Sequence, residues 1–217
     1  MKAGITSVVR SAVLTVALLG LFAGCASKSG YQQADKTGAG IDQFRNDIVD
    51  TKKAVDTTLS ELGNITTEAT VDPRKPYLRF AKSSARLESA VKKAQERAAA
   101  IREQGSAYFL QWEKDLVEVN NPEIRSLSHE RKAELKEAFN RIGKAMQVAN
   151  GDFKPFVSDV KDLEKYLGAD LTVAGITAAN DLIKKTKTEG ATVQQSLDAV
   201  IHELVIVEAA LTPARNK

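Results

Sequence analysis

Apolar and small residues recur at alternating spacings of three and four along almost the whole chain after residue 40. This spacing keeps them on one side of an α-helix, with the period near 3.5 residues that is typical of coiled-coil packing. Four segments carry such a seam, at about 41–69, 77–119, 128–167 and from 170 or 172 to 211. No segment shows the sustained alternation of a β-strand. The pattern therefore predicts an all-α protein.

Proline and glycine separate the four segments. Pro73 and Pro76 cause the first break and Pro122 causes the second, because proline lacks the amide hydrogen that a helix interior needs. Gly168 is suited to cap the third helix. Because the connections are short, consecutive helices should run antiparallel. We expect an elongated antiparallel four-helix bundle with coiled-coil-like heptad seams at 41–212, followed by a C-terminal tail at 213–217.

The seams also predict features along the rod. Ser128 is a candidate N-cap, and a stutter beside Gly151 and Pro155 predicts a kink in the third helix. When the helices are folded back on one another, large residues face small ones, as close packing requires. In that register Gly105 faces Ile142, and one thin layer contains Ala98, Ala149, Gly190 and Ile48. Because the first segment is the shortest, we expect only three helices at the end that carries residues 108–112.

The first 24 residues have the composition of an export signal. Lys2 and Arg10 precede the uncharged stretch 11–24, which is shorter than the roughly 20 residues that a membrane-spanning helix needs. Small residues then lead directly to Cys25, the only cysteine. A basic region, a short apolar region and small residues at the cut site predict a signal peptide at 1–24, cleaved between Gly24 and Cys25.

The position of Cys25 after Ala23 and Gly24 resembles the bacterial lipoprotein signal. This resemblance implies that Cys25 becomes the acylated first residue of the mature protein, carrying fatty acyl chains such as palmitate, and more than one chain gives a stable anchor. With Ala26 and Ser27 next, it implies the outer membrane, facing the periplasm. The alternative is an ordinary signal peptide with an incidental cysteine.

Residues 25–40 are rich in Gly, Ser, Ala and polar residues, and we expect a flexible linker after the lipidated cysteine. The whole chain carries 31 basic and 28 acidic residues, a net charge of +3. Removing Lys2 and Arg10 with the signal lowers the net charge to +1. A balanced charge gives no electrostatic argument for nucleic-acid binding.

Motifs for catalysis are not found in the sequence. His202 and Glu203 begin a metalloprotease pattern, but Ile206 stands where its second histidine would be. Neither His129 nor His202 has the glutamate three residues earlier that di-iron bundles use. Phosphate loops, nucleophile elbows and calcium loops are also missing. We therefore expect no enzyme activity, no cofactor and no metal site, and both histidines on the surface.

The most site-like cluster is Tyr108, Phe109 and Trp112. Tyr108 and Trp112 lie on the seam and would fill the wide end of the core, whereas Phe109 lies one position off it. The alternative is a contact surface for a partner, because aromatic residues are enriched at binding hot spots. The basic run at 184–187 is expected to be a solvated helix face, with contact to anionic lipid head groups as its alternative.

Two stretches suggest a family. The first, AQERAAAIREQGSAYFLQWEKDLVEVNNPEIRSLSHERKAEL, joins an arginine-rich helix, an aromatic-x-x-Trp-Glu element and an asparagine-containing turn. The second, FKPFVSDVKDLEKYLGADL, places a proline before a long periodic run. From about Ala81 to Leu211 the chain resembles an uncharacterised family of helical bacterial lipoproteins. The resemblance implies a lipoprotein with a helical hairpin, and it brings no activity and no catalytic residues.

The sequence thus predicts a non-enzymatic envelope lipoprotein, a helical scaffold or protein-interaction module anchored through Cys25 and bound to an unidentified envelope protein. The alternative is a carrier of a lipid or another apolar ligand between the helices, in a void left by small seam residues. Those residues are Ala94, Ala98, Ala149 and Gly190. A third candidate is a homo-oligomer that pairs through exposed seams at the three-helix end.

Overall fold

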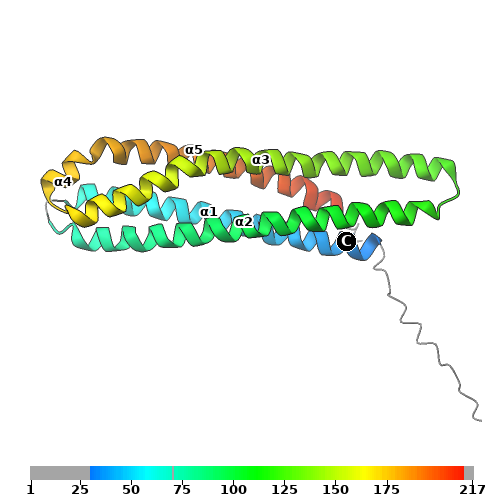
Figure 1. Ribbon diagram of the computed structural model, residues 1–217, viewed down its shortest axis with the longest axis horizontal. Coiled ribbons are helices and arrows are strands. Elements are labelled where there is room, and N and C mark those ends of the chain that lie inside the picture. Colours follow the sequence, from blue (N-terminus) through cyan, green and yellow to red (C-terminus); the bar gives the residue numbers. More distant parts are fainter. Residues whose placement is uncertain (1–29, 70, 213–217) are drawn as a thin grey trace, which may run out of the picture.

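The computed structural model describes residues 30–69 and 71–212, and within them all regular structure is helical. The helices are α1 (Gly30–Thr67), α2 (Arg74–Val117), α3 (Pro122–Ala169), α4 (Val173–Ala178) and α5 (Asn180–Leu211). The four long helices lie side by side in one elongated bundle, with the short α4 at one end (Figure 1). The predicted all-α bundle is confirmed.

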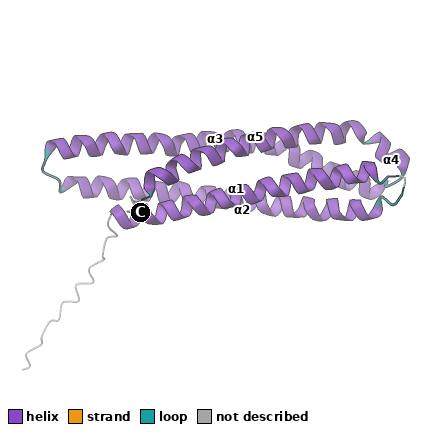
Figure 2. Cartoon of the chain, turned by 180° about the vertical axis from the view of Figure 1, so that it is seen from behind, coloured by secondary structure: helices purple, strands orange, loops and turns teal. Residues whose placement is uncertain are grey.

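Neighbouring helices run antiparallel in the order α1, α2, α3, α5, with α5 returning beside α1. Two ion pairs along an interface show the direction. Between α1 and α2, Arg79 Nε lies 2.8 Å from Glu61 and Arg97 Nε lies 3.0 Å from Asp47, so the residue numbers rise along α2 as they fall along α1. Between α3 and α5, Asp159 lies 2.7 Å from Lys185 Nζ and Arg141 Nε lies 2.9 Å from Glu203, which gives the same result. The closest pairs are α1 with α2 and α3 with α5, whereas α2 and α3 approach each other least closely. Figure 2 shows the same rod from behind, with loops only at its two ends.

The N-terminal part of the bundle differs from the prediction. Helix α1 begins at Gly30, so the flexible linker predicted at 25–40 is wrong for residues 30–40. Thr37 and Gly40 are buried there, and the Gly30 amide donates a hydrogen bond to the Asp115 carboxylate at 3.1 Å. Packing against α2 and α5 outweighs the low helix propensity of this glycine-containing segment. Cys25, the signal peptide at 1–24 and the tail at 213–217 lie outside the described residues.

Helix α3, which follows the α2–α3 connection, also begins earlier than expected. Helix α3 starts at Pro122, where the missing amide hydrogen of proline costs nothing. The Asn121 side chain caps it by accepting hydrogen bonds from the amides of Glu123 and Ile124 at 2.9 and 3.2 Å. Ser128 therefore lies inside the helix and is not its N-cap. Helix α3 continues through Pro155, and Figure 1 shows its axis changing direction in its second half, as predicted.

The end near the α2–α3 turn does have three helices, but the missing helix is α5 and not α1. Helix α1 reaches Asp115, whereas α5 ends at Leu211, near the level of Gly38. The Arg131 guanidinium donates to the Ala210 carbonyl at 3.2 Å, which places the last turn of α5 beside this part of α3. Beyond it, α3 is exposed at Ile124 and Leu127.

The predicted layers are shifted along the rod. A Cβ on Gly105 would lie 2.8 Å from the Phe139 ring, so Phe139 rather than Ile142 stands opposite this glycine. Gly190 faces Leu59 of α1 and does not share a layer with Ala149. The layer at Ala149 includes Ile48, as predicted, but Ala94 and Leu197 take the places expected for Ala98 and Gly190. Small residues still pack against large ones across the helix interfaces. The axial register of the helices therefore depends on which large side chain fits beside each small residue.

One buried ion-pair group joins α1 to α2. The Asp47 side chain is 7% exposed, and its oxygens lie 2.9 Å from Lys93 Nζ and 3.0 Å from Arg97 Nε. Burial raises the pKa of Asp47, but hydrogen bonds and charge from Lys93 and Arg97 lower the pKa by more, so it lies below its ordinary value. A carboxyl pKa depressed by folding stabilises the protein above the unfolded pKa, and this contribution is lost as the pH falls through the folded pKa.

We therefore predict that Asp47→Asn lowers the free energy of unfolding at pH 7 by about 1–3 kcal/mol, since it leaves two cations without a charged acceptor. The difference from wild type should shrink as the pH falls below about 4, where the unfolded chain takes up the proton first, and it is lost once the pH has also passed below the depressed pKa of the folded state. Urea denaturation at the two pH values measures this. Asp50→Asn is the control, because Asp50 is 63% exposed. Equal losses in the two variants would contradict the prediction.

Candidate functional site

The predicted aromatic cluster lies where α2 faces α3. Tyr108 is buried, and its ring centroid lies 5.4 Å from that of Phe109 and 5.5 Å from that of Trp112. Phe109 points toward α3, where its ring meets the edge of Phe139 with centroids 5.5 Å apart. The Trp112 indole N–H donates to the Ser128 hydroxyl at 2.7 Å. The cluster therefore joins the two helices, and its contact with a partner stays a prediction.

The environment of Tyr108 is apolar. Burial raises the pKa of its phenol, and the nearby charge of Arg131 offsets only part of that rise. The phenol is therefore neutral at physiological pH. In this state Tyr108 acts as a large packing group at the end of the core.

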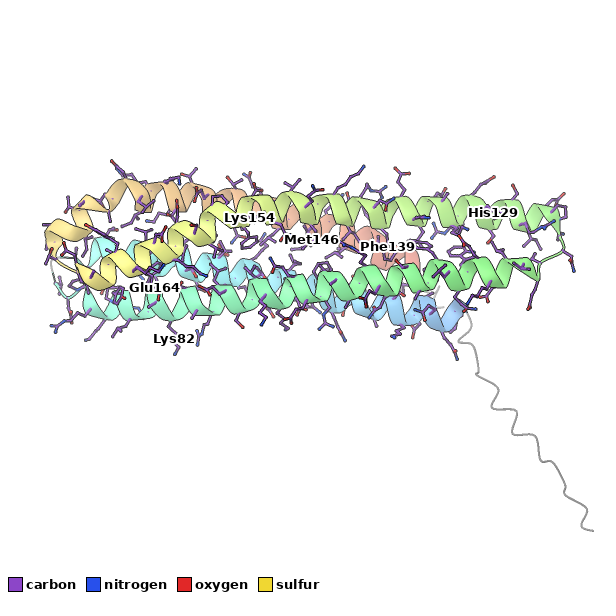
Figure 3. All side chains as sticks on the ribbon, in the orientation of Figure 1. Lys82, His129, Phe139, Met146, Lys154 and Glu164 are labelled. Atoms are coloured by element: carbon purple, nitrogen blue, oxygen red, sulfur yellow. The ribbon has the colours of Figure 1, made fainter. Side chains whose placement is uncertain are left out.

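A groove opens beside these rings, between α2 and α3. Its deepest part has a volume of about 310 Å³. Figure 3 shows Phe139 and Met146 of α3 in the space between the two helices. The walls are mainly apolar, and they include Ile101, Gly105, Phe109, Phe139, Ile142 and Met146. The groove is the least closely packed side of the bundle, since α2 and α3 are the most separated neighbours.

Small residues keep the groove open. Gly105 lets the Phe139 ring lie against the α2 backbone, and a Cβ on Gly143 would meet no atom within 4 Å. Ala98 adds a second short side chain on the α2 wall. The two glycines thus act differently, because Gly105 contacts the Phe139 ring whereas Gly143 borders empty space.

Polar contacts hold the two helices together on either side of the groove. At one end Lys132 binds Glu113 at 2.9 Å, next to the Trp112 hydrogen bond. Toward the other end Lys161 binds Glu88 at 3.1 Å, and the Tyr77 hydroxyl donates to the Glu164 carbonyl at 3.3 Å. The groove is therefore spanned at both ends and open between them.

The groove continues as shallower depressions toward the Lys161 end. Met146 also borders a narrow gap, together with Val91, Gln95 and Phe153. Val91, Gln95 and Phe153 in turn border a wider depression, which Val157 also lines. This wider depression has a volume of about 540 Å³ and is more open to solvent. The apolar surface thus forms one line between α2 and α3.

Unpaired cations border the deep part of the groove. Arg102 stands on the α2 side and Lys136 on the α3 side, and both are exposed. Neither forms an ion pair with any residue in the described ranges. Lys136 helps to lower the pKa of Glu113, but Lys132, which already binds that carboxylate, has the largest effect. The mouth of the groove therefore carries positive charge without a bound acidic partner.

The other predicted surface residues lie on the surface. His129 and His202 are exposed, as expected. In the basic run, Lys184 pairs with Asp181, and Lys185 pairs with Asp159 and Glu189, which fits a solvated helix face. Across residues 30–69 and 71–212, no group of three or more histidine, cysteine or acidic side chains is arranged to hold a metal ion. In the same ranges, no helix has the length and apolarity that crossing a membrane requires.

Sequence reasoning identified Tyr108, Phe109 and Trp112 but missed Phe139, Met146, Arg102 and Lys136. Phe139 and Met146 lie one position beyond the seam residues at 138 and 145, so the heptad pattern assigns them to the flank. The signal that could have found the groove is the pair of glycines, Gly105 and Gly143, in otherwise good helix-forming sequence.

The two glycines give a matched pair of substitutions. Gly143→Ala should raise the free energy of unfolding by about 0.5–1 kcal/mol, because alanine favours a helix and its methyl group meets open space. Gly105→Ala gains the same propensity but must displace the Phe139 ring, and overpacking of this kind costs about 1–3 kcal/mol. Thermal or urea denaturation of both variants should therefore give changes of opposite sign. Equal stabilisation by both would show that Phe139 does not rest on Gly105.

The comparisons with known proteins identify a family. Neither the curated proteins nor the solved structures contain a sequence that matches this chain. A family model described as protein of unknown function (DUF2959) matches residues 23–207, which include α1 to α4 and most of α5. An uncharacterised family, as the sequence predicted, is thus confirmed. This helical rod with an open α2–α3 side belongs to the DUF2959 family of proteins of unknown function.

Proposed function

We propose that this protein is a non-enzymatic lipoprotein of the cell envelope, a helical scaffold or interaction module held at the membrane by an acylated Cys25. The proposal places it at the outer membrane, facing the periplasm. Its support is the export signal that ends at Cys25, together with an elongated bundle of long helices. Helix α2 alone has 44 residues, or about 66 Å at 1.5 Å per residue.

The export signal that ends at Cys25 carries the proposal, and the contact between Gly30 and Asp115 decides which end of the rod the anchor would hold. This contact fixes the start of α1 beside the end of α2, next to the α2–α3 turn. From Cys25 to Gly30 the chain can span at most about 18 Å. An anchored Cys25 would therefore keep this end of the rod close to the membrane, and the α4 end would point away from it.

Replacing the cysteine tests the anchor. Cys25→Ser should move the protein from the membrane fraction to the soluble periplasmic fraction, because no acyl chain can then be attached. Fractionation and partition into detergent measure this. Ala26→Asp is the companion variant. It should keep the lipid but move the protein to the inner membrane, because in the enterobacterial sorting rule an aspartate directly after the cysteine retains a lipoprotein there. Cys25→Ser protein that stays with the membrane would refute the anchor.

A second candidate function is transport or storage of an apolar ligand, and the α2–α3 groove favours it. Its volume of about 310 Å³ lies at the lower end of the range for small-molecule sites, which begins near 300 Å³. Of the small seam residues expected to leave a void, Ala98 borders the groove, whereas Gly190 faces Leu59. The ligand space is thus between two neighbouring helices and not along the bundle axis.

Self-association remains a third candidate. Val117, Ile124 and Leu127 are 81%, 52% and 66% exposed near the α2–α3 turn, where α5 no longer covers the bundle. Exposed apolar side chains that gather at one end of a rod are a feature of contact surfaces. Crosslinking in intact cells would show whether this end meets a second copy or another envelope protein.

A further inference from the structure

We propose that the α2–α3 groove binds a single-chain anionic amphiphile, a long-chain fatty acid, with its acyl chain lying against Phe109, Phe139 and Met146 and its carboxylate at Arg102 and Lys136. This inference rests on the second candidate function and names its ligand. It depends on the groove and its charges, and it does not depend on the anchor at Cys25.

The groove has the surface that an acyl chain requires. Its walls are mainly apolar, and the side chains of Phe109, Phe139 and Met146 are only half-buried although they face it. Covering such surface stabilises a complex in proportion to the apolar area removed from water. The groove is also preformed, because contacts at its two ends keep α2 and α3 at a fixed separation. In a preformed site, no free energy of binding is lost in ordering the side chains and helices that contact the ligand.

The size of the groove favours one chain over two. About 310 Å³ is small for a ligand site, which extends to about 1,000 Å³ for larger molecules. From Ala98 to Phe109 the α2 wall of this space extends for about 17 Å at 1.5 Å per residue. A long narrow space of this kind fits an extended chain. A partner helix would need a wider opening than helices that are joined at both ends provide.

The charges at the groove favour an acid. Arg102 and Lys136 stand on opposite walls and form no ion pair with a described residue, although many other cations of the bundle do. Lys154, beside the shallower depression, is a third cation without an ion pair in the described ranges. The one acidic residue along these depressions, Glu88, is bound to Lys161. An arginine guanidinium and a lysine ammonium can each donate charge-assisted hydrogen bonds to a carboxylate.

The chain carries its own reporter for this site. Trp112 is the only tryptophan, and its ring is linked to the groove through Tyr108 and Phe109. The full chain with Cys25→Ser would be purified without detergent and titrated with a bromine-labelled fatty acid, which quenches nearby tryptophan fluorescence. We expect saturable quenching with one acid per chain, and displacement by unlabelled palmitate.

Two variants test the site separately. Gly143→Phe should weaken binding at least tenfold, because the ring would fill the groove from a position where a Cβ meets no atom within 4 Å. Its melting temperature, measured in parallel, shows that the bundle is intact. Arg102→Gln with Lys136→Gln should weaken acid binding about three- to tenfold and leave binding of the neutral methyl ester unchanged. Lys82→Gln is the control, since Figure 3 shows this side chain pointing away from α3.

Four results would overturn the assignment, and the first three concern the fatty acid and the protein variants. They are no saturable quenching by the acid, unchanged affinity in folded Gly143→Phe protein, and equal loss of acid and ester binding in the double variant. Tighter binding of a two-chain phospholipid than of the fatty acid would also contradict it. Fractionation of Cys25→Ser cells tests the anchor separately, so the anchor and the groove can each fail without the other.

Discussion

Burial of the α1 seam holds this bundle together. Its six large apolar side chains are at most 1% exposed, because α1 packs against both α2 and α5 along almost its whole length. The side chains are Ile41, Phe44, Ile48, Val55, Leu62 and Ile65. Helix α3 packs closely only on α5. The bundle is therefore joined into one body through α1 and α5, which leaves the opposite side, between α2 and α3, free to stay open.

The sequence was a reliable guide to the helices because their signals are local. A period near 3.5 and the prolines at 73, 76 and 122 are properties of neighbouring residues, and they indicate the four long helices whatever the packing. The start of α1 was missed because residues 30–40 have no strong helix preference of their own. Contacts with residues far along the chain, such as Asp115, form the helix there. Such contacts are not visible in a local pattern.

The axial register was harder to predict than the helices. A heptad seam looks nearly the same after a shift of one turn, so the pattern alone cannot decide whether Gly105 meets Ile142 or Phe139. The decision comes from the shape of one side chain, since the Phe139 ring fits where Gly105 has no Cβ. Trp112 and Tyr108 were found as site candidates because they are aromatic and on the seam. Arg102 and Lys136 were not, because only the three-dimensional arrangement shows that they border the same groove without ion-pair partners among the described residues.

The early start of α1 has a consequence for how the rod would meet other molecules. If Cys25 is acylated as proposed, only four residues separate it from the helix, and the end that carries Gly30 and Asp115 is confined to a thin layer above the lipid. Confinement on such a short connection raises the effective concentration of this end toward anything else in that membrane, to the millimolar range typical of short linkers. Even weak contacts there would then be occupied, whereas a partner of the α4 end would have to bind on its own affinity.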